Sequence, residues 1–106
     1  MTTFDKRDEG FEKKFALDEE QKFKAEARRN KLLGLWAADK QGLSGDAAGA
    51  YARDFITADF DEAGHGAFRK VTADLGAKGI AIADAQIRAK MDELMLLAIA
   101  QVKAGT

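Results

Sequence analysis

The chain of 106 residues contains no cysteine and no proline, a single histidine, and no run of 18 uncharged apolar residues. Without cysteine there is no disulfide, no thiolate nucleophile and no zinc site built on thiolates. The lone His65 stands between two glycines, so we expect it in an exposed turn rather than in a metal site. No Ser-His-Asp or Cys-His pattern stands out either, and we therefore predict no catalytic residues and no enzyme.

Charge and hydropathy exclude further classes of protein. The 17 Lys+Arg and 18 Asp+Glu leave a formal net charge of −1, which favours neither nucleic acid nor an anionic membrane. Because long apolar runs and a signal-peptide core are lacking, we expect a cytoplasmic protein without membrane insertion. Asp59 and Asp61 begin like a calcium loop, but Lys70 occupies the position that requires a glutamate. Those acids are instead expected to close a helix, and no metal is predicted.

The remaining composition favours α-helix. Proline is absent and alanine is frequent, and glycines separate four helical runs. We expect these helices at residues 18–40, at 45–62 after a Ser44 cap, around 68–75, and from 83 or 84 to 103. Four amphipathic helices with short connections predict an all-α fold, a small four-helix bundle.

Charge is concentrated at the N-terminus. The first 31 residues hold nine Lys/Arg and eight Asp/Glu, which leaves 18 charged residues for the other 75. Apart from Met1, the only large apolar side chains among the first 16 are Phe4, Phe11 and Phe15. On a helix these three rings fall within an arc of about 40°. So narrow an aromatic stripe cannot build a core by itself and is typical of a segment that docks into a groove on another molecule.

The aromatic stripe does not continue into the first helix of the bundle. If the helix is extended in phase from Phe15, the next apolar group on that face is Leu33. Asp18, Lys22 and Arg29 occupy the same face between them. The phenylalanine cluster and the apolar end of the first helix therefore serve different surfaces.

These patterns predict two parts, an arm at residues 1–17 and a four-helix bundle at 18–106. Gly10 lies inside the phenylalanine cluster and costs about 1 kcal/mol of helix stability relative to alanine. We expect the arm to be mobile, frayed or disordered, when free and helical on a partner. The alternative is that the phenylalanine stripe folds back on the bundle as core.

Two stretches resemble a known family. They read DKRDEGFEKKFA at residues 5–16 and KFKAEARRNKLLGLWAA at 22–38, and both are similar to the zeta subunit, an inhibitor of the F-type ATP synthase in alphaproteobacteria. Residues 84–88 and 91–100 also fit the last helix of that family. The resemblance implies a bundle preceded by an inhibitory arm, with the catalytic head of the synthase as partner. In that family the arm inserts between catalytic and non-catalytic subunits near the rotor and blocks rotation in the hydrolytic direction.

Carried onto this sequence, the resemblance places the inhibitory contact on twelve arm residues: Phe4, Asp5, Lys6, Arg7, Asp8, Glu9, Gly10, Phe11, Glu12, Lys13, Lys14 and Phe15. No cofactor is required for this function. One alternative is a small bundle that binds ADP or ATP weakly, with Trp36 as the candidate for stacking on the base, although its leucine neighbours favour ordinary core packing. A general helical adaptor for an unrelated protein partner is the other alternative.

Overall fold

The computed structural model describes residues 17–60 and 65–105. They form four α-helices and one short 3-10 helix, namely α2 (Glu19–Lys40), α3 (Gly45–Ile56), η1 (Ala58–Phe60), α4 (Gly66–Ala77) and α5 (Asp84–Lys103). Neither described range contains a β-strand. The predicted all-α four-helix bundle is confirmed.

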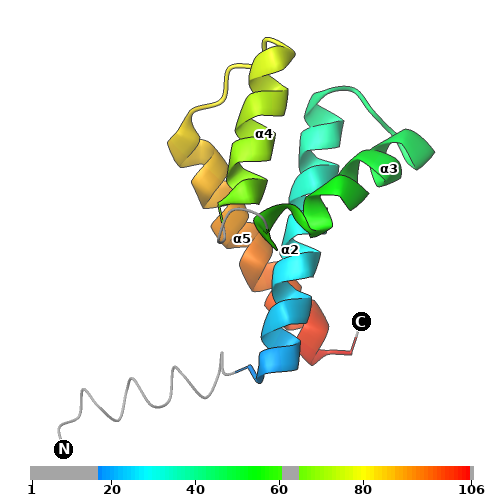
Figure 1. Ribbon diagram of the computed structural model, residues 1–106, viewed down its shortest axis with the longest axis vertical. Helices are drawn as coiled ribbons and strands as arrows, with labels where there is room; N and C mark the ends of the chain where they lie inside the picture. Colours follow the sequence, from blue (N-terminus) through cyan, green and yellow to red (C-terminus); the bar gives the residue numbers. More distant parts are fainter. Residues whose placement is uncertain (1–16, 61–64, 106) are drawn as a thin grey trace, which may run out of the picture.

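Helix α2 is the centre of the bundle (Figure 1). It packs chiefly against α3 and α5 and less extensively against α4, which in turn contacts η1 and α5. The C-terminal end of α5 lies beside the N-terminal end of α2, where the Arg28 guanidinium donates to the side-chain oxygen of Gln101 at 3.3 Å. The described chain therefore begins and ends at the same end of the molecule.

A capping box sets the start of α2. The Asp18 carboxylate accepts a hydrogen bond from the Gln21 backbone N–H at 2.7 Å, and the Gln21 side chain accepts one from the Asp18 N–H at 3.3 Å. This reciprocal pair satisfies backbone donors that a helix N-terminus leaves open. Glu19 and Glu20 in the first turn complement the helix dipole, as does Lys40 in the last. The predicted helix at 18–40 is confirmed, with Asp18 as its cap.

The second helix is shorter than predicted. Regular α-helix ends at Ile56 rather than near Glu62, and residues Ala58–Phe60 form the separate 3-10 helix η1. Within η1, the Asp59 carboxylate accepts hydrogen bonds from two side chains of α2, Arg29 and Asn30. Ser44 does occupy the N-cap position, but its side chain makes no capping hydrogen bond.

The last two helices agree with the prediction. After α4, Gly79 adopts a φ of 73°, and the Ile80 N–H donates to the Leu75 carbonyl at 2.9 Å, which closes the helix end. The next helix, α5, starts at Asp84, and the Gln86 side chain accepts a hydrogen bond from the Ala83 N–H at 3.1 Å. His65 is the N-cap residue of α4 and is exposed, which confirms the exposed position predicted for it.

One buried cluster unites all four helices. Its members are Leu33, Ala37, Phe55, Ala67, Val71, Leu75, Ile87 and Met91. Gly34 allows α2 and α3 to approach closely, because a Cβ at that position would lie 2.7 Å from the Ala52 Cα and 2.9 Å from a Phe55 ring carbon. The core is thus built on the C-terminal half of α2, away from the end that carries the arm.

Candidate functional site

All twelve arm residues singled out in the sequence, Phe4 to Phe15, lie outside the described residues. The structure describes the chain from Leu17 onward, where the half-buried Leu17 precedes the capping box of α2. The predicted division at residue 17 and the assignment of the arm as a binding segment therefore stay predictions. What the structure supplies is the geometry of the surface next to the arm.

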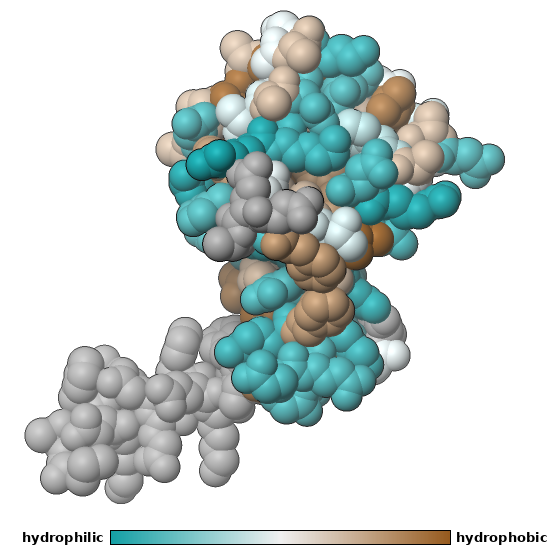
Figure 2. All heavy atoms as spheres, viewed as in Figure 1, coloured by the Kyte–Doolittle hydropathy of each residue, from teal (hydrophilic) through white to brown (hydrophobic). Residues whose placement is uncertain are grey.

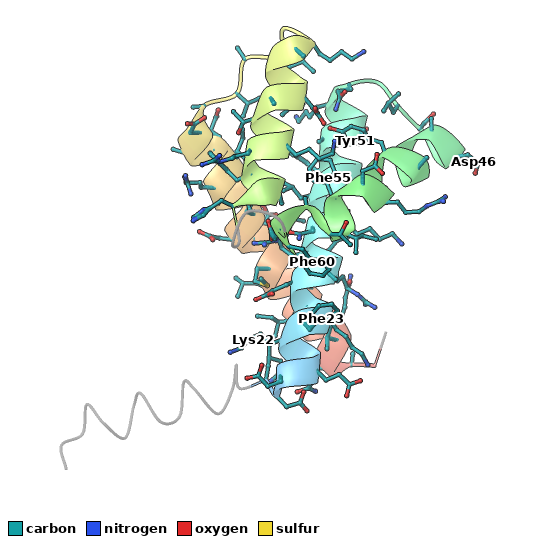
Figure 3. All side chains as sticks on the ribbon, viewed as in Figure 1. Lys22, Phe23, Asp46, Tyr51, Phe55 and Phe60 are labelled. Atoms are coloured by element: carbon teal, nitrogen blue, oxygen red, sulfur yellow. The ribbon has the colours of Figure 1, made fainter. Side chains whose placement is uncertain are left out.

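The N-terminal half of α2 is charged and largely exposed. Lys22 and Phe23 project from it into solvent (Figure 3), and the ammonium of Lys24 lies 3.0 Å from the Glu20 carboxylate. Only Ala25 is buried among the first two turns of the helix. This half of the helix is consequently available to a partner rather than committed to the core.

Arg29, one of the charges on the face between Phe15 and Leu33, is almost buried. Its Nη2 lies 3.0 Å from Oδ2 of Asp59, and the two side chains are only 13% and 14% exposed. The Asn30 amide also donates to the same carboxylate oxygen at 3.0 Å, while the Arg29 Nε donates to the Asn30 Oδ1 at 2.7 Å. Arg29 is therefore part of an almost buried polar network.

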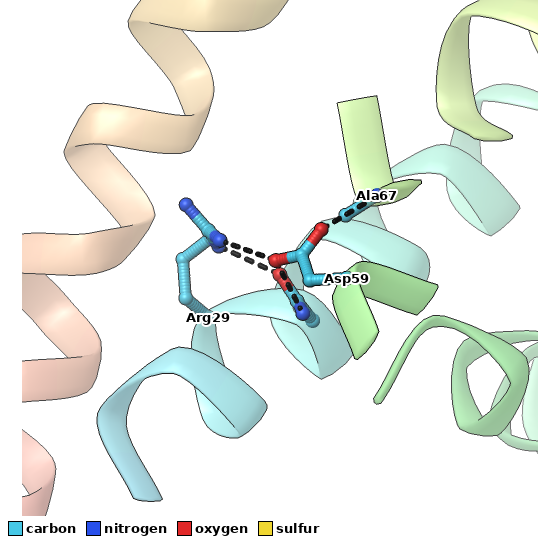
Figure 4. Close-up of polar contacts among 4 residues, drawn as sticks. Arg29, Asp59 and Ala67 are labelled. Atoms are coloured by element: carbon cyan, nitrogen blue, oxygen red, sulfur yellow. Dashed lines mark hydrogen bonds and ion pairs between the residues drawn. The ribbon is translucent and has the colours of Figure 1, made fainter. Parts of the chain in front are cut away.

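Asp59 is the centre of this network (Figure 4). Its second oxygen, Oδ1, accepts a hydrogen bond from the Ala67 backbone N–H at 2.8 Å, so one carboxylate caps α4 and holds α2. The expectation that Asp59 closes the second helix is wrong. Its negative charge sits at the N-terminus of α4, where the helix dipole favours it, instead of at the C-terminus of α3.

An exposed aromatic pair lies next to the network. The rings of Phe23 and Phe60 stack with centroids 5.7 Å apart and planes 26° apart, and the two residues are 55% and 61% exposed. Figure 3 shows both side chains on the same face of α2, and Figure 2 shows an apolar strip crossing that face between hydrophilic areas. A hollow of about 290 Å³ beside the pair is lined in part by Ile56 and Met95.

A larger hollow of about 920 Å³ flanks the other side of Phe23. It runs between the first turns of α2 and the end of α5, and Ala27, Leu35 and Val102 contribute apolar lining. Charged lining comes from two acidic and three basic side chains, Asp18, Glu20, Lys24, Arg28 and Lys31. The hollow is thus amphipathic and opens next to the point where the arm joins the bundle.

Trp36, the candidate for nucleotide stacking, lies elsewhere. It is half-buried against the hydrophobic core, and the Lys40 ammonium lies 5.7 Å from its ring centroid. Core packing therefore accounts for much of this side chain. Binding of ADP or ATP at Trp36 stays a prediction.

A second polar cluster joins α3 to α4. The Tyr51 hydroxyl donates to Oδ2 of Asp74 at 2.6 Å, and the Lys70 ammonium lies 3.2 Å from the same oxygen. Lys70 also lies 5.3 Å from the centroid of the Phe55 ring. Burial, followed by the hydrogen bond to Asp74, raises the pKa of Tyr51 well above its ordinary value. These contacts join the two helices and point to a structural role.

No group of three or more potential ligands in residues 17–60 and 65–105 could hold a metal ion. No helix in that same part of the chain is long and apolar enough to cross a membrane.

Sequence reasoning missed two features of this surface, the role of Asp59 and the pairing of Phe23 with Phe60. Asp59 contacts partners 30, 29 and 8 residues away. Spacing along one helix carries no signal for such contacts. The nearest clue in the sequence was that Asp59 lies seven residues before the helix start at Gly66, which His65 does not cap with its own side chain.

Two of three comparisons relate the chain to known proteins. No curated protein matches it. A solution NMR structure matches with 52% sequence identity and a TM-score of 0.69, over 79% of this chain and 96% of that one. A family model described as ATPase inhibitor subunit zeta matches residues 1–101, which include both the arm and nearly all of the bundle. The chain therefore belongs to the ATPase inhibitor subunit zeta family.

Proposed function

We propose that this protein inhibits ATP hydrolysis by the F-type ATP synthase by inserting residues 4–15 as a helix into the catalytic head near the rotor. The observation that carries the proposal is the family match, because it extends over residues 1–101 and so includes the arm itself. An inhibitor-subunit family is regulatory rather than catalytic, and its target is the synthase. The site of insertion and the subunits contacted are part of the proposal.

The side chains of the arm suit a groove. Burying one phenylalanine contributes about 1.5–3 kcal/mol, so Phe4, Phe11 and Phe15 are the main apolar contribution of the arm. Fixing the backbone of each residue costs about 1–2 kcal/mol, so ordering a twelve-residue segment costs more than the three rings contribute, and contacts of the other arm residues must supply the rest. The alternating charges between the rings then set register and orientation at the mouth of the groove.

The bundle suits the role of a bulky anchor outside the groove. Its core is formed by α2 to α5, and the capping box at Asp18 gives α2 a defined start directly after the arm. A folded body attached to an inserted helix limits how far the helix can enter the groove.

The decisive experiment measures ATP hydrolysis by the cognate catalytic head with the intact chain and with a chain lacking residues 1–17. We expect inhibition by the intact chain only. Equal inhibition by both would show that the arm is not the inhibitory element, and inhibition by neither would remove the proposed function.

A sharper variant keeps the full length of the chain. Replacing Phe11 and Phe15 together by alanine removes about 3–6 kcal/mol of burial, so the half-inhibitory concentration is expected to rise at least about 100-fold. Leu96→Ala is the matched control, since it removes apolar side-chain atoms from a residue that is 57% exposed on α5 and does not belong to the arm. An unchanged half-inhibitory concentration in the double variant would contradict insertion of the phenylalanine stripe.

A further inference from the structure

Methionine supplies all of the sulfur in this chain. The 106 residues contain three methionines and no cysteine. Met91 and Met95 lie about one turn apart on α5, and Met1 lies outside the described residues. A peroxide that reaches a methionine converts its thioether to a sulfoxide, which makes a flexible apolar side chain polar. The surroundings of the two methionines on α5 therefore decide where oxidation acts.

The two side chains differ in accessibility. Met91 belongs to the buried core cluster and is 9% exposed. Met95 is half-buried and lines the hollow of about 290 Å³ beside Phe23 and Phe60. About 10–15 Å³ is enough for one water molecule, so hydrogen peroxide, which is only slightly larger than water, fits into this hollow. We therefore expect a peroxide to reach Met95 in the folded chain and to reach Met91 mainly when the core opens.

A change at Met95 affects several elements of the fold. The hollow is lined by residues of α2, α3, η1 and α5, and Met95 is the residue from α5. Apolar lining comes from Phe23, Ala27, Ile56 and Phe60. A sulfoxide among these groups loses part of its hydration, and this loss costs free energy unless a hydrogen-bond donor replaces the water.

Two donors in the lining are already paired. Arg29 and Asn30 also line the hollow, and both donate to Oδ2 of Asp59 at 3.0 Å. A sulfoxide oxygen is a stronger acceptor than a thioether sulfur, which accepts only weakly. At Met95 it therefore either stays unpaired or competes with Asp59 for these two side chains, and the folded chain loses stability in both cases.

We propose that Met95 is a site of reversible oxidation by hydrogen peroxide and that its sulfoxide loosens the fold around the hollow. In this step the O–O bond of the peroxide breaks, and one oxygen forms a bond with the Met95 sulfur. The sulfur loses two electrons, the peroxide is reduced, and the second oxygen leaves as water with both hydrogens. Methionine sulfoxide reductases reverse the step with two thiols, which end as a disulfide while the oxygen leaves as water.

The first test measures the rate at which each methionine is oxidised in the folded chain. Dilute hydrogen peroxide is added, the chain is cleaved after Lys90 and Lys103, and fragment ions of the peptide 91–103 separate the two sites in a mass spectrometer. Met95 is expected to be oxidised at least about fivefold faster than Met91, and the two rates are expected to become equal in urea-unfolded chain. Equal rates in the folded chain, or faster oxidation of Met91, would overturn the proposal.

The second test measures the effect on folding with a matched pair of variants. Met95→Leu and Met91→Leu nearly conserve side-chain volume, so both are expected to fold. At an exposure that oxidises Met95 completely, the equilibrium constant of unfolding in urea is expected to rise about tenfold in the unsubstituted chain and in Met91→Leu. The rise should be less than about twofold in Met95→Leu, and treatment with the two reductases should reverse it in the other two chains. An equal rise in Met95→Leu, or no rise in the unsubstituted chain, would refute the role of the Met95 sulfoxide.

These experiments stay decisive if a variant fails to fold or if the proposed function is wrong. The comparison of oxidation rates uses the unsubstituted chain alone, so it tests the site even if circular dichroism shows that Met95→Leu is unfolded. Neither test uses the catalytic head or measures ATP hydrolysis. Failure of the oxidation experiments would therefore leave the proposed inhibition untouched, and absence of inhibition would leave the oxidation site untouched.

Discussion

Replacing Asp59 by alanine is expected to destabilise the bundle by about 2–4 kcal/mol. The substitution removes the acceptor of three hydrogen bonds and leaves the guanidinium of Arg29 without its carboxylate in a site where that side chain is 13% exposed. Breaking a fully buried ion pair costs about 3–5 kcal/mol, and the residual access of water to Arg29 reduces that figure. Loss of the cap on α4 adds about 1 kcal/mol. Against a total stability of about 5–15 kcal/mol, the variant stays mostly folded but loses a large share of its margin.

A double-mutant cycle isolates the contribution of the pair itself. Urea unfolding of Arg29→Ala, Asp59→Ala and the double variant, followed by helical circular dichroism, is expected to give a coupling energy of about 1–3 kcal/mol. The matched control is the cycle on Glu20 and Lys24, whose charges lie at the same 3.0 Å separation but are 76% and 61% exposed. Exposed pairs of this spacing contribute about 0.3–0.5 kcal/mol. A coupling energy for Arg29 and Asp59 no larger than that of the control would refute the view that this network fixes η1 to α2.

Two further predictions test the packing of α3. Gly34→Ala is expected to destabilise the bundle by about 1–2 kcal/mol, because its Cβ would lie 2.7 Å from the Ala52 backbone and the overlap exceeds the gain in helix propensity. Gly49→Ala, whose Cβ meets nothing within 4 Å, should stabilise the bundle by about 0.5–1 kcal/mol. Urea unfolding measures both variants, and a gain of stability in Gly34→Ala like that in Gly49→Ala would contradict the close approach of α2 and α3. The pKa of Tyr51 is raised in the folded chain, so the folded chain holds the phenolic proton to higher pH than the unfolded chain. The contribution of the protonated Tyr51 hydroxyl to stability is therefore complete below about pH 10 and falls as the pH rises further. Since this is the sole tyrosine, an ultraviolet absorbance titration follows it directly, and ionisation of the folded chain near the ordinary value of 10.0 would contradict the burial of its hydroxyl against Asp74.

The boundaries that the sequence predicted well are those set by local chemistry. Asp18 and Gln21 form a capping box within four residues, and Gly79 takes the left-handed conformation that ends α4. Such signals depend only on neighbouring residues, so one sequence is enough to find them. The last helix also follows local signals, since apolar residues recur at helical spacing in α5 and Ile87, Met91 and Ala98 among them are buried.

The predictions that failed depend on contacts between distant residues. A helix extending to Glu62 was expected because glycines separate the helical runs, but regular α-helix ends at Ile56, and Asp59 contacts Arg29 and the N-terminus of α4 instead. Arg29 was identified from the sequence only as a charge on the face between Phe15 and Leu33. Its burial could not be predicted, because its partner lies on another element 30 residues later. The stacking of Phe23 on Phe60 was missed for the same reason.

The two halves of α2 meet different demands, and this division explains where substitutions should act. Five of its six buried residues, Asn30, Leu33, Gly34, Ala37 and Ala38, lie in the C-terminal half, where small side chains let α3 approach. The N-terminal half buries only Ala25 and presents charges and Phe23 to solvent. Arg29 and Asn30 stand at the junction and tie it to η1 and α4 through Asp59. Substitutions beyond this junction should therefore change the free energy of unfolding, whereas exposed substitutions before it should change it by no more than about 0.5 kcal/mol. Asp59 is the described residue that joins η1 to both α2 and α4, so its loss is expected to weaken the contacts among all three elements.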